Sequence, residues 1–463
     1  MMTKMISKTS YDEFVVYDMS DILDINRIHD DEYLKSMHIQ TVRPKSSKYI
    51  ILKYKKESLR EENDLGKKRQ IGYIRSVIYD TEKKCIVSNS PSKSMDIDAM
   101  NDKDKLSTAL PDTFRVEEYV EGTMINVFWN EIGPASGWIR STRSVIGAKT
   151  AFYNNTYHPS NSGEITPTFK KSTYSDMFDD CLYASSFSLD RLDKNYSYSF
   201  LIQHPINKIV TQVHTPKLYL CGMYRTEGNK VFEKPLYRYN SNGDGIEFNP
   251  IVVKIFRRSS VCIPYVDVSV KNVNDAILKY ENAEKTHFSI QGIFLKKGNQ
   301  TFKLRNPNNK YVRELRGNQS KIQYHFYELR KENKIREFLT FFPEYSLMFS
   351  SMEKEINLFT QTLYYMYHMC YRFKTKELTE IPYEFRNHVW ELHRYYLTNL
   401  RPKRQGIQFK NVMKHLSMLE PARLMFSVNF GKRSEPEGMA HMCGYTESIN
   451  PNLSNQVSQI VGN

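Results

Sequence analysis

The sequence lacks the apolar runs that mark membrane proteins and secreted precursors. No stretch approaches the roughly 18 consecutive apolar residues that a membrane-spanning helix needs. The first residues, Met1–Phe14, lack the apolar core of a signal peptide. These absences predict an intracellular, cytoplasmic protein without a membrane partner.

Closely spaced cysteines are also missing. The chain has no CxxC pair, which argues against a zinc site and against a secreted disulfide framework, and predicts reduced thiols. His388 and His393 are five residues apart, so a helix would place them on different faces, and we expect surface residues rather than metal ligands. The six cysteines are Cys85, Cys181, Cys221, Cys262, Cys370 and Cys443.

Positive charge is plentiful. The 463 residues carry a net charge of +14, and aromatic residues make up 13% of them. A chain this basic favours a polyanionic partner, and nucleic acid is the commonest one. The alternative is a generally basic surface without a specific partner.

Short strands dominate residues 40 to 320. Val, Ile, Tyr and Phe are enriched in runs bounded by turn residues, and a helical pattern covers 274–284, which together predict an α+β body with antiparallel sheets. The polar stretch 151–198 predicts a mobile loop. The expected strands include Tyr49–Tyr54, Gly72–Tyr79, Met124–Trp129, Lys217–Met223, Ile251–Phe256 and Gly292–Leu295.

The pattern changes after about residue 320. Apolar residues from Met352 to Cys370 recur at alternating spacings of four and three, which predicts a packed helix. Further helices are expected over 321–341, 384–400 and 409–427. We therefore expect an N-terminal extension over 1–44, an α+β domain over 45–320, an all-helical domain over 321–430 and a flexible tail over 431–463. Basic residues of the helical part are Arg401, Lys403, Arg404, Lys410 and Lys414.

The segment EEYVEGTMINVFW, Glu117 to Trp129, is the most informative motif. Glu121, Gly122 and Thr123 form a turn that opens a strand. This arrangement resembles the first motif of ATP-dependent RNA ligases and related nucleotidyltransferases, Lys-x-Asp-Gly-Ser/Thr, in which the Lys accepts AMP. Here the position of that Lys is Tyr119.

Two later segments resemble further motifs of the same family. FLIQHPINKIV, starting at Phe200, resembles the segment after the third motif, and Leu201 stands where the family carries a Glu. IQGIFLKKGNQTFKLR, starting at Ile290, resembles the fourth and fifth motifs. There Gln291 replaces a Glu, and Lys303 and Arg305 match the basic residues.

Basic residues between and before these motifs complete the resemblance. IRSTRSVIGA, starting at Ile139, resembles the basic strand after the nucleophile motif and implies that Arg140 and Arg143 lie near a phosphate. Arg75 and Lys93 resemble positions that steer the triphosphate. The likeness covers residues 45–320 and is nearest to RNA-ligase-like proteins of large DNA viruses, so it implies a nucleotidyltransferase domain there.

The substitutions remove the chemistry of that family. A phenol near pH 7 is neutral, with a pKa of about 10, and is a poor substitute for a flexible lysine amine. Mg²⁺ prefers carboxylates, and of three family acids only Glu121 remains as a metal ligand. No catalytic residue is therefore predicted, and the basic residues, Tyr119, Gly122 and Gln291 are expected to bind nucleotide or RNA.

Three functions stay open from the sequence. The first is a catalytically degenerate protein that binds RNA or nucleotide. The second is an active ATP-dependent RNA ligase, using ATP and Mg²⁺, whose nucleophile has moved to Lys93 or Lys149. The third is a structural protein, for example a virion component, that kept only the fold; a viral protein would be found in the host cytoplasm or the virion.

Overall fold

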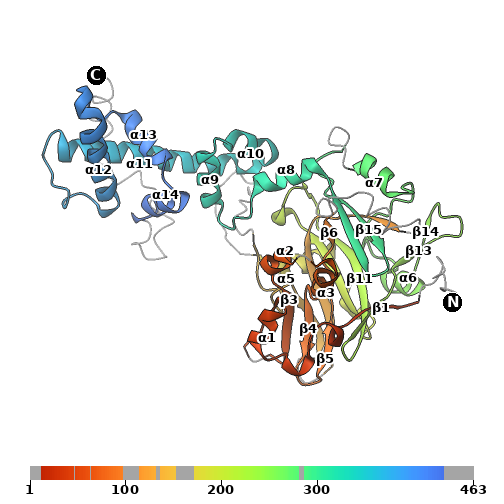
Figure 1. The fold of residues 1–463 in the computed structure, drawn as a ribbon. Helices are drawn as coiled ribbons and strands as arrows, with labels where there is room; N and C mark the ends of the chain where they lie inside the picture. The colour runs from red at the N-terminus through yellow and green to blue at the C-terminus, as the bar shows by residue number, and fades with distance from the viewer. Residues whose placement is uncertain are drawn as a thin grey trace. The chain divides into compact units, whose positions relative to one another are not determined.

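The computed structural model describes residues 12–45, 47–62, 64–96, 114–131, 136–152, 172–280 and 286–431. These residues fall into two units, one ending at Arg316 and one beginning at Gly317. Figure 1 shows sheets with flanking helices in the first unit, and helices α9 to α14 in the second. The expected tail after 431 and residues 153–171 of the expected loop stretch 151–198 lie outside the described residues. The described remainder of that stretch includes a helix, Tyr174–Ala184, and the start of a strand, Ser197–Gln203.

A six-stranded antiparallel sheet forms the centre of the first unit. Its longest strand, KLYLCGMYRTE, buries alternate residues such as Leu218 and Leu220, as a strand with one face on the core should. Helix α5 (Tyr174–Ala184) begins with a capping box of Thr173 and Asp176 and packs onto the sheet. The strand order is β1 (Phe14–Asp18), β12 (Lys230–Glu233), β11 (Lys217–Glu227), β10 (Ser197–Gln203), β8 (Thr123–Asn130), β9 (Gly137–Ser141).

A four-stranded sheet carries the fourth- and fifth-motif segment. One of its faces holds Val116, Ile293, Leu295, Phe302 and Leu304, which form a buried apolar cluster with helix α7 (Val273–Tyr280). The opposite face carries the alternate, mainly polar residues. The strand order is β6 (Met95–Asp96), β16 (Gln300–Arg305), β15 (Gly292–Lys297), β7 (Arg115–Glu118).

The N-terminal residues are part of the first unit. The sequence suggested an extension over 1–44, but β1 pairs with β12 and β2 pairs with β3. This sheet has the order β2 (Ile39–Val42), β3 (Tyr49–Tyr54), β4 (Val77–Asp80), β5 (Cys85–Ser88), and a hairpin joins β13 (Tyr237–Tyr239) to β14 (Ile246–Phe248). The remaining helices of the unit are α1 (Asp31–Ser36), α2 (Lys56–Glu61), α3 (Leu65–Tyr73), α6 (Pro250–Phe256) and α8 (Pro307–Arg316).

Two expected strands are wrong. Ile251–Phe256 belongs to helix α6, because Asn249 caps its N-terminus by accepting from the Ile251 N–H and Pro250 takes the first turn. Gly72–Tyr79 is divided between the end of α3 and strand β4. In both segments, helix-starting residues upstream outweigh the β-branched composition.

The second unit consists of helices in its described part. The stripe from Met352 to Cys370 lies in the 26-residue helix α11, which buries Ile356, Phe359 and Leu363 and packs against α12 and α13. The expectation of a surface His388 is wrong, because this residue is 2% exposed. The helices are α9 (Ile322–Lys331), α10 (Ile335–Phe341), α11 (Ser346–Tyr371), α12 (Tyr383–Tyr395) with a π-turn over Tyr396–Leu400, α13 (Phe409–Ser417) and α14 (Pro421–Val428).

Among the described residues, no helix is both long enough and apolar enough to cross a membrane.

Candidate functional site

The EEYVEGT segment connects the two main sheets of the first unit. Glu117 and Glu118 are the last two residues of β7 in the four-stranded sheet. Thr123 is the first residue of β8 in the six-stranded sheet. Gly122 is required at this crossing, because a Cβ there would lie 2.3 Å from Leu201 Cδ2 and 2.4 Å from the Ile202 carbonyl oxygen. The turn that the sequence indicated therefore brings the two sheets together.

A cavity of about 230 Å³ opens beside this segment. It receives side chains from both sheets, from α8 and from the loop before β6. Its lining includes Arg75, Ser92, Ser94, Arg115, Glu117, Glu118, Tyr119, Gly122, Met124, Leu201, Glu233, Gln291, Phe294, Lys296, Thr301 and Arg313.

The three positions at which the sequence departs from the ligase motifs meet in this cavity. Tyr119, Leu201 and Gln291 all line it, although they come from three distant segments. Gln291 is 4% exposed, and its Oε1 has no hydrogen-bond donor among the described residues. Leu201 fills the space against Gly122. The side chains at the three motif positions are thus neutral. The buried Oε1 of Gln291 can accept a hydrogen bond that no described residue donates.

An aromatic surface lies on one side of the cavity. The Tyr119 ring packs against the Phe294 ring, with centroids 4.4 Å apart and planes tilted by 38°. The Arg305 guanidinium lies 6.0 Å from the centre of the Tyr119 ring, at the outer limit of a cation–π contact. This arrangement offers a flat π-surface on which a nucleobase could stack.

A buried ion pair lies on the cavity wall. Lys296 Nζ is 2.5 Å from Glu117 Oε2, and the Tyr237 hydroxyl donates to Glu117 Oε1 at 2.6 Å. Burial opposes ionisation of Glu117, yet the Lys296 ammonium and the Arg115 guanidinium bring its pKa below the ordinary value. Burial raises the pKa of Glu233, which lacks such a close partner ion.

Glu121 faces away from the cavity. Its Oε1 accepts hydrogen bonds from the backbone N–H groups of Val210 and Thr211, each at 2.9 Å. Burial raises the pKa of this carboxyl. Glu121 therefore fixes the segment after β10, and it is not among the residues that line the cavity.

The two basic residues that resemble the fifth motif share one carboxylate. Lys303 Nζ lies 2.9 Å from Asp96 Oδ2, and Arg305 Nε donates to Asp96 Oδ1 at 3.2 Å. Burial is the main effect on the Lys303 amine and lowers its pKa. Asp96 lies on β6, which pairs with β16 so that Lys303 is directly opposite it.

Arg75 and Lys93, which the resemblance linked to the triphosphate, differ in whether they line the cavity. Arg75 lines the cavity and donates to the Pro91 carbonyl at 3.4 Å. Lys93 does not line it, and its Nζ donates to the Ser94 carbonyl at 3.1 Å. Burial, together with the neighbouring Lys303 ammonium, lowers the pKa of Lys93 to about 8.

Arg140 and Arg143 do not line the cavity. Arg140 donates to both carboxylate oxygens of Asp179, at 2.6 and 2.5 Å. Arg143 donates to the Tyr54 carbonyl at 2.9 Å, and its guanidinium lies 4.6 Å from the centre of the Tyr54 ring. Lys149 is exposed and is not among the lining residues either. Arg140 and Arg143 therefore join elements of the fold.

Sequence reasoning missed the charged residues beside the motifs. Arg115, Glu117 and Tyr119 alternate along the chain, and Phe294 and Lys296 alternate on the paired strand β15. Because side chains two apart share a face of a strand, this period of two was the available signal. Arg313 on α8 had no such signal.

Comparisons with known proteins give little further information. No protein-family model matches the chain, and no curated protein matches it. Among solved structures, the chain is similar to one described as "Putative ATP-dependent DNA ligase from Aquifex aeolicus", with 12% identity over 80% of this chain and 79% of that chain and a TM-score of 0.34.

Proposed function

We propose that this protein binds a nucleotide, free or at the end of single-stranded RNA, on a ligase-like scaffold that no longer transfers AMP. One observation carries the proposal: Tyr119, Leu201 and Gln291, the positions at which the ligase motifs have a nucleophile and two acids, line one cavity. Chance resemblance of three separate segments gives no reason for them to converge. Their convergence supports the motif assignment and a shared site.

The cavity lining argues against AMP transfer. Lys296 is the lysine that lines this cavity among the described residues, and its ammonium is paired with Glu117 at 2.5 Å. An amine held in such an ion pair is not free to attack phosphorus. Leu201 and Gln291 also supply no anionic ligand for Mg²⁺ at the two motif positions, and the carboxylates that line the cavity, Glu117, Glu118 and Glu233, lie at other positions.

The same lining retains what binding needs. Tyr119 and Phe294 offer stacking for a base, and Arg75 and Arg313 offer positive charge for phosphate. The unpaired Oε1 of Gln291 can accept from a base amino group or a ribose hydroxyl. Recognition would therefore join stacking, one amide contact and electrostatic attraction.

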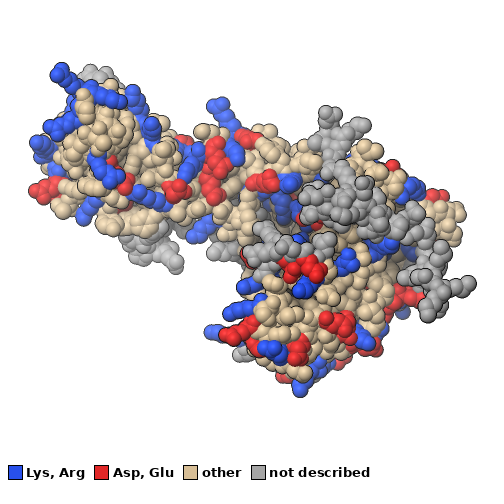
Figure 2. Space-filling view, viewed as in Figure 1, with Lys and Arg blue, Asp and Glu red and all other residues tan. Residues whose placement is uncertain are grey.

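A second surface supports a polyanionic partner. Figure 2 shows Lys and Arg side chains on the surface around α12 and α13. The stretch 401–414 contains five basic residues, all exposed, and no acidic residue. Counterion release from such a stretch would make RNA binding fall with rising salt.

Binding is tested with fluorescent ATP and with fluorescent single-stranded RNA, each titrated at several salt concentrations. In the variant Arg75→Glu/Arg313→Glu we expect at least tenfold weaker nucleotide binding, because two cavity cations become anions. The matched control is Lys254→Glu, a charge reversal at an exposed position of α6 outside the cavity. Tyr119→Ala, which removes the stacking ring, is a second test without charge change. Unaltered binding in both cavity variants would contradict the proposal.

The position and pKa of Lys93 favour a second candidate function, an active ATP-dependent RNA ligase. Lys93 has a pKa of about 8, so a useful fraction of its amine is neutral near physiological pH, and its neighbours Ser92 and Ser94 line the cavity. An active ligase with Lys93 as nucleophile would be labelled by α-labelled ATP with Mg²⁺ or Mn²⁺. Label that is lost in Lys93→Arg, but kept in Lys149→Arg, would establish this second function and overturn the first.

A further inference from the structure

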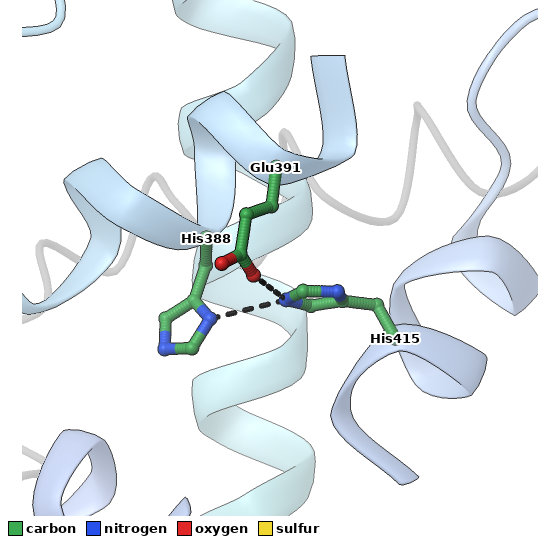
Figure 3. Close-up of side chains that lie close together, drawn as sticks. All are labelled: His388, Glu391 and His415. Atoms are coloured by element: carbon green, nitrogen blue, oxygen red, sulfur yellow. Dashed lines mark hydrogen bonds and ion pairs between the residues drawn. The ribbon is translucent and has the colours of Figure 1, made fainter. Parts of the chain in front are cut away.

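Three potential metal ligands converge in the second, helical unit. His388 and Glu391 lie one turn apart on α12, and His415 lies on α13 (Figure 3). Their ligand atoms all lie within 4.8 Å of one another. Among the described residues, no other group of His, Cys, Asp and Glu side chains meets this condition.

The separations match those of ligands around one small cation. His388 Nδ1 is 3.1 Å from His415 Nε2, and His415 Nε2 is 3.6 Å from Glu391 Oε2. Zinc binds such atoms at about 2.0 to 2.1 Å, which puts tetrahedral ligands roughly 3.3 Å apart. A cation between these atoms would need small side-chain movements and no change in the helices.

The hydrogen bonds of His388 leave one ring nitrogen for the cluster. Ser427 donates its hydroxyl hydrogen to the Arg423 carbonyl at 3.1 Å, so its oxygen can accept from Nε2 of His388, 2.9 Å away. In that tautomer the proton of His388 is on Nε2, and the lone pair of Nδ1 faces His415.

The groups around the cluster orient the remaining ligand. Arg423 on α14 donates to Glu391 Oε1 at 2.7 Å, which leaves Oε2 directed at His415. Contacts of this kind, from a second layer of residues, hold metal ligands in place in known sites. The positive charge of Arg423 beside Glu391 reduces the attraction of the site for a cation.

The cluster is open on one side. Glu391 and His415 line a cavity of about 530 Å³ that Arg394, Asn411 and Lys414 also line. The side chains of Glu391 and His415 are 23% and 17% exposed, whereas His388 is nearly buried. The cavity provides an entry path and room for a water molecule as the fourth ligand, as in zinc sites with three protein ligands.

We propose that His388, Glu391 and His415 bind one divalent transition-metal ion of the zinc class, with a fourth position open to solvent. Two neutral imidazoles and one carboxylate fit borderline-soft ions such as Zn²⁺ and Co²⁺ better than Mg²⁺ or Ca²⁺. Bound metal would connect α12 to α13 and stabilise the helical unit. The absence of CxxC pairs argued against zinc, but that argument covers sites with cysteine ligands only.

The test uses the full chain, stripped of metal with a chelator and titrated with Co²⁺ and Zn²⁺. We expect Co²⁺ to give the visible absorption of a four-coordinate site at one equivalent, and Zn²⁺ to displace it and raise the melting temperature. His388→Gln and His415→Gln should each weaken metal binding at least tenfold. The control is His393→Gln, also on α12, which removes a ring stacked on Tyr371 at 3.6 Å and should leave metal binding unchanged.

Two outcomes would overturn the proposal. The first is a wild-type chain without four-coordinate Co²⁺ absorption, which needs no folded variant to interpret. The second is equal metal binding by the wild type and both ligand variants. In either case the three side chains form a hydrogen-bonded contact between helices only. Magnesium, titrated in place of zinc, should leave the melting temperature unchanged.

Discussion

The Nζ atom of Lys296 lies 2.5 Å from Oε2 of Glu117, across the pair of strands β15 and β7. Glu117 is directly opposite Phe294, so Lys296 reaches the carboxylate diagonally from the next position on the same face. The pair joins two strands and engages the one lysine that lines the cavity among the described residues. It is therefore both a stabilising contact and a reason for the lack of a free amine.

Glu117→Gln should destabilise the first unit. Glu117 is 6% exposed and the Lys296 side chain 20% exposed, so the substitution leaves a largely buried ammonium without its carboxylate. Breaking a buried ion pair by removing one partner costs about 3 kcal/mol. We expect the unfolding free energy of the variant, measured by urea titration, to fall by this amount. Glu117→Gln/Lys296→Met should recover part of this loss.

The control for this prediction is an exposed ion pair. Lys83 and Glu131 are 3.0 Å apart, with side chains 38% and 66% exposed. Glu131→Gln should change the unfolding free energy by less than about 1 kcal/mol. Equal effects of the two substitutions would mean that burial of the Glu117–Lys296 pair has no energetic consequence.

Asp267 should make the first unit sensitive to acid. Burial opposes its ionisation, but hydrogen bonds from Lys279, Ser269 and Tyr280 outweigh burial and lower its pKa to about 2. Because the pKa of Asp267 is lower in the folded chain, its ionised carboxylate stabilises the fold. This stabilisation is complete at pH values above the ordinary pKa of 3.8 and is lost as the pH falls towards 2.

Asp267→Asn tests this directly. The variant should lose about 2 kcal/mol at pH 6, because the ionised carboxylate and its partners no longer interact. Its stability should also fall less than that of the wild type between pH 4 and 2. Asp190→Asn, at an exposed position, is the control. Parallel pH profiles of wild type and Asp267→Asn would contradict the assignment.

Gly122→Ala should disturb the junction of the two sheets. The new methyl group would lie 2.4 Å from the Ile202 carbonyl oxygen, a backbone atom that cannot rotate away. We expect a loss of at least about 2 kcal/mol in unfolding free energy. Gly122→Ala/Leu201→Ala should not restore stability, since the carbonyl remains. Gly406→Ala meets nothing within 4 Å and should be nearly neutral.

Tyr119→Lys should not create an adenylylated protein. The substitution restores the nucleophile of the motif, but Leu201 and Gln291 still provide no carboxylate for Mg²⁺ at the same cavity. We expect no label from α-labelled ATP, measured after denaturing electrophoresis. If the Tyr119→Lys variant is labelled without any further substitution, the missing nucleophile is the only defect in AMP transfer.

The fold class could be predicted from the sequence because it depends on local patterns. Alternation in segments such as Lys217–Met223, and the period of the stripe in α11, predicted an α+β body with antiparallel sheets followed by helices, and this prediction is confirmed. The failure at Ile251–Phe256 has a local cause as well. Strand propensity was read without the capping of Asn249 and Pro250 just upstream.

The candidate site was only partly predictable. Tyr119, Gly122 and Gln291 were found because they lie inside motifs, and the cavity brings them together. Arg140, Arg143, Lys303 and Arg305 were predicted from their resemblance to basic motif positions, but a match in sequence does not tell whether an acidic partner is near. Asp179 and Asp96 engage three of these four residues, and such pairs depend on how distant segments approach.

The sequence by itself determined most of the strands and helices and the absence of a lysine at position 119, because these follow from neighbouring residues. Only the tertiary structure decided which charges are neutralised and which ligands converge. Glu117 meets Lys296, and His388 meets His415, because sheet pairing and helix packing bring together residues that are far apart in the chain. Electrostatic interactions and metal coordination depend on distance in space, so they appear only when the chain is folded.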